Sequence, residues 1–91
     1  MKYIVKYTGR FQKDYKKLVK RKLDVSKVHE AIEILASGNV LPGKYHDHAL
    51  SGNYQGAREC HIGPDWLLIY SIADDTLVLE LLRTGSHSDL F

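Results

Sequence analysis

Residues 57–83, ARECHIGPDWLLIYSIADDTLVLELLR, decide the fold of this chain. Three apolar runs lie in this stretch, at Ala57–Ile62, Trp66–Ile72 and Thr76–Arg83. The turn-forming pairs Gly63-Pro64 and Asp74-Asp75 separate them, which predicts a three-stranded antiparallel meander. The second and third runs are apolar on both faces. We therefore expect central strands that are covered on both sides, or strands with one face left for a partner.

The part of the chain before this meander predicts one strand and two helices. Residues 2–7 alternate with the period of a strand. Apolar residues then follow helical spacing, first at Phe11, Tyr15, Leu18 and Val19 and next at Val28, Ala31, Ile32 and Leu35. Asp24 or Ser26 can cap the second helix, and Gly38 can end it. We predict an α+β fold of strand–helix–helix followed by the meander, with the helices packed on one face of the sheet.

Length and composition limit what such a fold can contain. The chain has 91 residues, 44% of them hydrophobic, and a single cysteine. These values predict one domain over residues 1–91, too small for a large internal cavity, so any active site should be a shallow groove. One cysteine excludes an intramolecular disulfide framework. No apolar run approaches the ~20 residues of a membrane span, and the N-terminus lacks the apolar core of a signal peptide. We expect a cytoplasmic location and no membrane partner.

Charge is distributed unevenly along the chain, although its net value is only +2. Residues 1–45 carry 11 Lys and Arg against 4 acidic residues, whereas residues 46–91 carry 2 against 7. Four of the five histidines lie in the second, acidic half. The first predicted helix bears a cluster of lysines, namely Lys13, Lys16, Lys17 and Lys20. A polyanion such as RNA could bind there; the alternative is a solvated lysine-rich helix.

Residues able to do chemistry gather at one end of the predicted sheet. Antiparallel pairing should bring together His61, Asp65, Trp66, Arg83 and His87. Residues 39–56 predict a long ordered loop that can reach the same place and that carries His46 and His48. If the loop is extended there, these two histidines point in opposite directions, so at most one should enter the site.

Each of these residues also has a purely structural interpretation. Asp65 could only start a turn, Trp66 could belong to the core, and Arg83 could form a surface ion pair. Phe91 could simply fix the C-terminus. Cys60 and His61 are adjacent on a strand and point to opposite faces, so a thiol–imidazole pair is excluded and Cys60 is expected in the core.

The predicted group of side chains matches what RNA cleavage requires. A base removes the proton of a ribose 2′-hydroxyl, an acid protonates the departing 5′-oxygen, and histidine can serve as either near neutral pH. Arginine offers phosphate a planar set of donors, and Trp66 and Phe91 could stack on bases. This mechanism needs no metal. A zinc site is disfavoured because the sequence has no HExxH or CxxC motif.

Motifs along the whole chain resemble the RelE/YafQ family of bacterial toxin endoribonucleases, and its YafQ-type branch in particular. The motifs are Phe11–Leu18 (FQKDYKKL), His48–Gly52 (HALSG), Arg58–Ile62 (RECHI), Pro64–Tyr70 (PDWLLIY) and Arg83–Phe91 (RTGSHSDLF). The resemblance covers essentially the entire sequence, and its HSDLF-type ending is highly specific.

This resemblance implies a ribosome-dependent mRNA endoribonuclease that works without metal or other cofactor. His48, His61, Asp65 and His87 would be the acid–base set, with His87 the preferred acid and His48 or Asp65 the base. Arg83 would stabilise the phosphate, and Trp66 and Phe91 would position the substrate. A RelB/DinJ-like antitoxin would be the partner and would cover the open face of the sheet, while the lysines would bind ribosomal RNA. Two alternatives stay open, a non-catalytic RNA- or ribosome-binding translation inhibitor and a zinc hydrolase.

Overall fold

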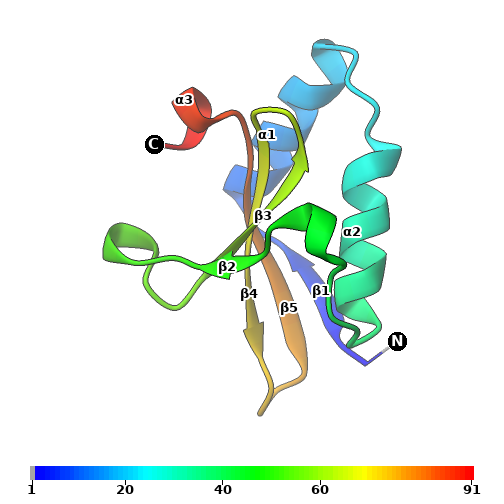
Figure 1. Ribbon diagram of the computed structural model, residues 1–91, viewed down its shortest axis with the longest axis vertical. Helices are drawn as coiled ribbons and strands as arrows, with labels where there is room; N and C mark the ends of the chain where they lie inside the picture. Colours follow the sequence, from blue (N-terminus) through cyan, green and yellow to red (C-terminus); the bar gives the residue numbers. More distant parts are fainter. Residues whose placement is uncertain (1) are drawn as a thin grey trace.

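The computed structural model describes residues 2–91 as an α+β protein built on one sheet, which confirms the predicted fold class (Figure 1). In chain order its elements are β1 (Ile4–Tyr7), α1 (Gly9–Lys20), α2 (Ser26–Ala36), η1 (Gly43–Tyr45), β2 (His48–Ala49), η2 (Gly52–Tyr54), β3 (Arg58–Gly63), β4 (Trp66–Ala73), β5 (Val78–Gly85) and α3 (His87–Leu90). The sheet order is β1-β5-β4-β3-β2, with β1 parallel to β5 and the other neighbours antiparallel. The meander β3–β4–β5 thus forms its centre, as predicted.

Local sequence signals determine where α1 begins and which face it buries. The Thr8 side chain caps the helix by accepting a hydrogen bond from the Phe11 N–H (3.0 Å). The buried residues of α1 are Phe11, Asp14 and Leu18, whereas Val19 is 54% exposed. The prediction that Val19 belongs to the apolar face was therefore wrong, and an acidic residue faces the sheet in this helix.

The second helix ends where the sequence predicted but is not capped as predicted. Its N-cap residue is Val25, with no side-chain capping hydrogen bond, and the Asp24 carboxylate accepts a hydrogen bond from the Ser26 N–H at 3.1 Å. Beyond its end, Gly38 adopts φ +83°, a backbone conformation that favours glycine. A Cβ at Gly38 would lie only 2.6 Å from a carbon of the Lys2 side chain. A side chain at this position would therefore be strained on both counts.

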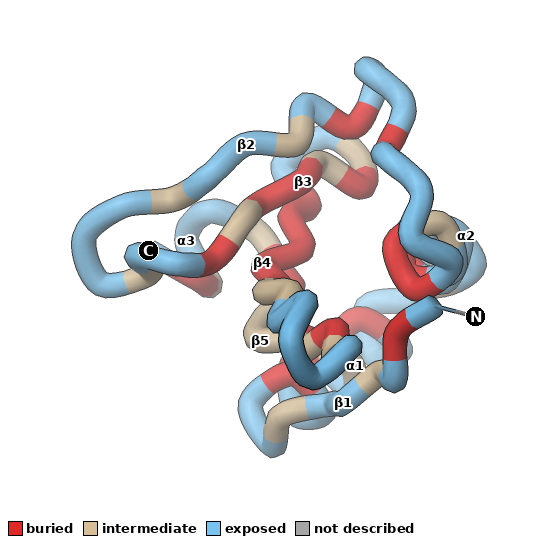
Figure 2. Tube along the Cα trace, turned by 90° about the horizontal axis from the view of Figure 1, so that it is seen from below, coloured by how far each residue is buried: buried red, intermediate tan, exposed pale blue. Residues whose placement is uncertain are grey.

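Two apolar clusters lie on the two faces of the sheet. In Figure 2 the buried residues are concentrated in the sheet strands β3 and β4 and on the side of α2 that is turned towards the sheet. The larger cluster lies between the sheet and helices α1 and α2 and contains Leu18, Val28, Leu68 and Leu79. On the other face, Ala57, Leu67, Ile69 and Leu90 pack together beneath the loop around η2 and beneath α3. The chain itself therefore covers the second face. The prediction that an antitoxin supplies the missing cover was wrong.

Strand β5 ends at Gly85, two residues later than predicted, and a side chain of α1 forms a hydrogen bond with the backbone near this end. Pairing of β1 with β5 ends at Leu81. Beyond that point, the Thr84 N–H donates a hydrogen bond to the Asp14 carboxylate (3.2 Å) instead of to a strand. Asp14 therefore satisfies a backbone group that would otherwise be unpaired at the edge of the sheet.

Within residues 2–91, no helix is both long enough and apolar enough to cross a membrane.

Candidate active site

Four histidine rings lie close together on the face of the sheet that α1 and α2 leave uncovered. His61 is central, with its ring centroid 6.2 Å from that of His48 and 6.3 Å from that of His87. His48 comes from β2, His61 from β3 and His87 from α3. The predicted convergence of these three imidazoles is confirmed, although the roles assigned to them stay predictions.

His46 joins the same group, contrary to expectation. Its ring centroid lies 5.7 Å from that of His61. The prediction that only one of His46 and His48 could enter the site assumed an extended backbone. His46 instead has a left-handed conformation, with φ +47° and ψ +46°, at the end of η1. This turn redirects its side chain, so that both histidines reach His61.

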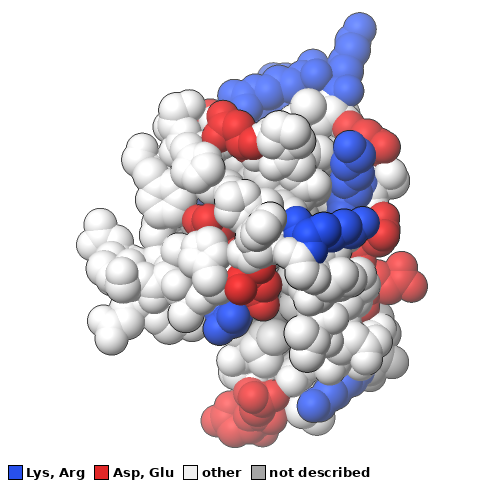
Figure 3. All heavy atoms as spheres, in the orientation of Figure 1, with Lys and Arg blue, Asp and Glu red and all other residues white. Residues whose placement is uncertain are grey.

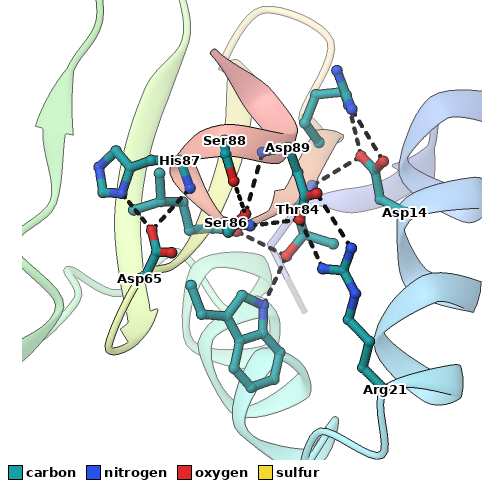
Figure 4. Close-up of polar contacts among 11 residues, drawn as sticks. Asp14, Arg21, Asp65, Thr84, Ser86, His87, Ser88 and Asp89 are labelled. Carbon is teal, nitrogen blue, oxygen red and sulfur yellow. Dashed lines mark hydrogen bonds and ion pairs between the residues drawn. The ribbon is translucent and has the colours of Figure 1, made fainter.

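His87 is held by the carboxylate of Asp65 (Figure 4). Oδ1 of Asp65 lies 2.7 Å from the ring Nδ1 of His87 and accepts the His87 backbone N–H at 2.9 Å. Both side chains are exposed, at 58% for His87 and 62% for Asp65. The backbone and side-chain hydrogen bonds from His87 lower the pKa of Asp65. An ionised Asp65 accepts the Nδ1 hydrogen and leaves Nε2 of His87 free to contact a substrate.

The element that carries His87 is fixed by its own sequence. Ser86 and Asp89 form a capping box, in which the Ser86 hydroxyl accepts the Asp89 N–H and the Asp89 carboxylate accepts the Ser86 N–H. Arg21 also donates to Asp89, at 2.8 Å. These hydrogen bonds keep the pKa of Asp89 well below its usual range. The short helix α3 is thus fastened to the turn between α1 and α2.

Glu59 is a site residue that the sequence analysis missed. Its carboxylate is buried, and its Oε1 lies 3.5 Å from Nε2 of His48 and 3.7 Å from Nε2 of His61. Glu59 is paired with His48 across the β2–β3 ladder and shares the face of β3 with His61. The alternation of Glu59, Cys60 and His61 along one strand was the signal that could have found it.

Trp66 is part of the core and not a stacking platform, so its predicted role in substrate binding was wrong. It is only 7% exposed and belongs to the larger apolar cluster. Its indole N–H donates to the Thr84 hydroxyl at 3.0 Å, and that hydroxyl donates to the Leu67 carbonyl at 2.8 Å. Trp66 therefore has a buried hydrogen-bond partner, as buried indoles normally do.

Arg83 is engaged by an acidic residue that the sequence analysis did not consider. Its Nε and Nη2 donate to the Asp14 carboxylate at 2.6 and 3.1 Å, and the two side chains are 11% and 6% exposed. Register places Arg83 opposite Ile69, so the expectation that it lies beside Trp66 and Asp65 was also wrong. The structure confirms the alternative of an ion pair, although the pair is buried and not on the surface.

The C-terminal aromatic residue lies beside the histidines. Phe91 is 63% exposed, and its ring centroid is 6.3 Å from that of His87 and 5.5 Å from that of Tyr54. An adjoining groove of about 690 Å³ is lined by Arg10, Ser51, Asn53, Tyr54, Arg83, Asp89, Leu90 and Phe91. Phe91 therefore stands between the histidine cluster and this groove, which suits an extended ligand.

The lysine cluster of α1 is solvent-exposed. Lys13, Lys16, Lys17 and Lys20 are all exposed, and none forms an ion pair with a residue in the range 2–91. Figure 3 shows a group of Lys and Arg at the α1–α2 end of this face, whereas Asp and Glu are spread over the face, with one group at the β4–β5 end. The separation along the sequence is thus partly a separation in space.

One group of described residues has the spacing of metal ligands. The ligand atoms of His48, Glu59 and His61 all lie within 4.8 Å of one another. Two imidazoles and a carboxylate suit a transition metal such as Cu²⁺ or Zn²⁺. A bound metal would occupy the same nitrogens that acid–base chemistry needs. Cys60 is fully buried, as predicted, and burial raises the pKa of its thiol to about 12, which keeps the thiol inert.

The sheet thus has α1 and α2 packed on one face and the histidine–carboxylate cluster on the other. The sequence profile of the YafQ toxins of bacterial type II toxin–antitoxin systems matches residues 3–91, and the chain belongs to that family. The mRNA interferase toxin YafQ of Escherichia coli K12 is 40% identical over 88 residues, which are 96% of this chain and 94% of that protein.

Two solved structures are similar over almost the whole chain. The toxin in the E. coli DinJ–YafQ complex is 38% identical, covers 98% of both chains and superposes with a TM-score of 0.89. A copper-bound mutant toxin from Helicobacter pylori is 42% identical, covers 100% of both chains and gives a TM-score of 0.90. The fold and the family are therefore shared along the entire described chain.

Proposed function

We propose that this chain is the toxin of a toxin–antitoxin pair and acts as an mRNA endoribonuclease on the ribosome. The observation that carries the proposal is the cluster of His48, His61 and His87 on the side of the sheet opposite α1 and α2, with His87 held by Asp65. The relative from E. coli is named an mRNA interferase, which supports the same activity here.

In the proposed reaction, an imidazole removes the proton of a ribose 2′-hydroxyl, and the resulting oxygen attacks the adjacent phosphorus. The 5′-oxygen of the next nucleotide leaves and takes a proton from the acid, which leaves a 2′,3′-cyclic phosphate. His87 suits the acid because Asp65 holds Nδ1 and leaves Nε2 to face the RNA. The carboxylate of Asp65 already accepts two N–H groups, so we assign it to positioning His87 and leave the base to His48 or His61.

Glu59 lies against these imidazoles. Its buried carboxylate faces Nε2 of both His48 and His61, at 3.5 and 3.7 Å. Phe91 is the exposed aromatic ring beside His87 and takes the stacking role that Trp66 cannot take. Arg83 also lines the neighbouring groove, although its Nε and Nη2 are engaged by Asp14.

The experiment is primer extension on messages from cells that express the protein, compared with His87→Ala and His61→Ala. We expect new 5′ ends and growth arrest with the unchanged protein and neither with the two variants. A non-catalytic translation inhibitor would arrest growth without new 5′ ends. Cleavage that persists at the normal rate in both variants would overturn the site assignment.

A metal-dependent hydrolase is the second candidate, because His48, Glu59 and His61 have the spacing of metal ligands. The two candidates differ in their response to a chelator. The acid–base mechanism predicts that EDTA leaves cleavage by the purified protein on ribosomes supplied with fresh Mg²⁺ unchanged. Added Cu²⁺ should inhibit it, since the metal would take up imidazole nitrogens. Activity that is lost in EDTA and restored by Zn²⁺ would favour the hydrolase.

We further propose a DinJ-like antitoxin as the partner, because the E. coli relative has been solved in complex with DinJ. The second face of the sheet is already covered, so the antitoxin must bind over existing side chains and not replace a missing layer. Co-expression with the neighbouring reading frame should yield a stable complex and restore growth. His87→Ala should still form this complex.

A further inference from the structure

The groove beside Phe91 has features that the cleavage reaction itself does not use. It is about 690 Å³ in volume and contains one cation, Arg10, that forms no ion pair within residues 2–91. The other charged groups in its wall are already engaged. Arg83 is bound by Asp14, and the Asp89 carboxylate accepts hydrogen bonds from Arg21 and the Ser86 N–H.

Aromatic and amide groups line the rest of this groove. The rings of Tyr54 and Phe91 meet edge to face, with centroids 5.5 Å apart, and Phe91 in turn contacts the ring of His87. Asn53 and Ser51 are exposed at the loop side. A free guanidinium, an aromatic surface and an amide are the three groups that phosphate, base stacking and base-edge recognition require.

We propose that this groove binds the nucleotide next to the one that is cut. Arg10 holds its phosphate, Phe91 stacks on its base, and Asn53 reads the edge of that base. The proposal rests on the nuclease function proposed above and adds to it a source of sequence preference. The ring of Phe91 lies 6.3 Å from that of His87, which itself lies 6.3 Å from that of His61, so the groove begins directly beside the histidine cluster.

The test uses ribosomes programmed with messages that carry each of the four bases on either side of the cut. We expect Asn53→Ala to flatten the base preference at one flanking position by roughly fivefold while cleavage continues. Arg10→Ala should raise the half-saturating toxin concentration by roughly tenfold with little change in the maximal rate. Asn39→Ala and Lys6→Ala are the matched controls, because both residues are exposed outside the groove.

The outcomes separate this proposal from the nuclease proposal. If the unchanged protein cleaves and both groove variants keep its base profile and its half-saturating concentration, the groove assignment is wrong and the nuclease assignment stands. If the unchanged protein does not cleave at all, the nuclease assignment itself fails. Equal thermal midpoints for variants and controls exclude loss of folding as the cause.

Asp47 lies between the two loop histidines, His46 and His48, and its carboxylate points away from them. Its Oδ1 accepts the Tyr70 hydroxyl at 2.6 Å and the Arg58 Nε–H at 3.3 Å. Tyr70 is buried in the cluster beneath the helices. The ring of His48 is held in turn through its Nδ1, which lies 2.8 Å from the His46 carbonyl.

We infer that Asp47 is a positioning residue for His46 and His48. Because its side chain is anchored on the helix-covered side of the sheet, the two neighbouring imidazoles are held on the opposite side, next to His61. The His46 carbonyl can only accept a hydrogen bond, so Nδ1 of His48 carries the hydrogen and Nε2 is left to face Glu59. Loss of the anchor should therefore disturb the rings without removing any imidazole.

Tyr70→Phe is the sharpest test, because it removes one hydrogen bond to Asp47 and keeps the buried ring. We expect kcat to fall roughly tenfold with KM unchanged, and the ring resonances of His46 and His48 to shift in histidine NMR spectra. The matched control is Tyr15→Phe, which removes the hydroxyl contact to His29 (2.8 Å) outside the site. It should shift His29 alone and leave kcat unchanged.

Asp47→Asn provides a second variant in case the first is silent. It keeps a carbonyl oxygen for Tyr70 but removes the charge that Arg58 binds. Unmoved His48 resonances and an unchanged kcat in both variants would overturn the inference. The NMR measurement needs no nuclease activity, so it tests the positioning role even if the proposed function is wrong.

Discussion

Two acid–base pairs close to each other in the fold have opposite characters. Asp14 and Arg83 are 6% and 11% exposed and are joined by two hydrogen bonds, and Asp14 also accepts the Thr84 N–H. Asp65 and His87 are 62% and 58% exposed, and the backbone N–H and the ring Nδ1 of His87 both contact the same oxygen, Oδ1 of Asp65. From the sequence, Arg83, Asp65 and His87 were candidates for catalysis, whereas Asp14 was not considered.

Burial separates a pair that holds the fold from a pair that is available to a substrate. A buried charge depends on its partner, because the partner replaces the water that both groups lost. An exposed pair costs little to form and little to break, and its groups can turn to other ligands. We therefore assign the Asp14–Arg83 pair mainly to stability and the Asp65–His87 pair to chemistry.

The largest expected effect is on catalysis, at His87. His87→Ala should lower cleavage on programmed ribosomes by roughly 10²–10⁴-fold, the usual contribution of a general acid or base. Its stability in urea should stay close to that of the unchanged protein, because the side chain is exposed. A strong loss of stability together with normal specific activity would show that His87 serves the fold and not catalysis.

The second effect is on stability, at Asp14. Asp14→Ala leaves the guanidinium of Arg83 and the N–H of Thr84 without their partner. We expect the free energy of unfolding to fall by about 3 kcal/mol, at the lower end of values for broken buried pairs. Urea denaturation measures this change, with Asp75→Ala as the exposed control. A change equal to that of the control would show that burial does not make this pair structural.

The third effect is smaller and concerns Asp65. Asp65→Asn keeps an oxygen that can accept the His87 N–H groups but removes the charge that holds the imidazole. We expect roughly tenfold slower cleavage and almost unchanged stability. Cleavage at the normal rate in this variant would remove Asp65 from the site.

The smallest effect appears in acid, where the lowered pKa values of Asp65 and Asp89 act. A carboxyl whose pKa is lower in the folded state stabilises that state above its unfolded pKa of about 3.9 and loses this contribution as pH falls further. We expect α3 to loosen below about pH 4, before the sheet unfolds. The amide resonances of residues 87–90 measure this, and simultaneous loss of α3 and β4 would contradict it.

The sequence predicted the meander and both helices well, because their signals are local. The turn pairs and the helical spacing each act within a few residues, and the structure follows them. The parallel pairing of β1 with β5 was not predicted. It joins segments more than 70 residues apart, and no local pattern marks such a pairing.

The site was predicted only in part, for physical reasons that differ from residue to residue. The histidines converge as strand order and register imply. The role of Trp66 was predicted wrongly because a tryptophan in the sequence looks the same whether its indole is buried in the core or exposed to a substrate. His46 was misjudged because a left-handed residue breaks the alternation that the prediction assumed. Asp14 lies on a helix face otherwise lined by apolar residues, so only the packed structure shows that it binds Arg83.

The measurement closest to the central claim is the chemical analysis of the ends that the purified protein leaves on RNA. Cleavage on programmed ribosomes, with the toxin pretreated with EDTA, should give a 2′,3′-cyclic phosphate and a 5′-hydroxyl. A message with a 2′-deoxynucleotide at the cut should resist cleavage there. Ends with a 3′-hydroxyl and a 5′-phosphate, or efficient cutting at the deoxynucleotide, would contradict attack by a ribose hydroxyl activated by the histidine cluster.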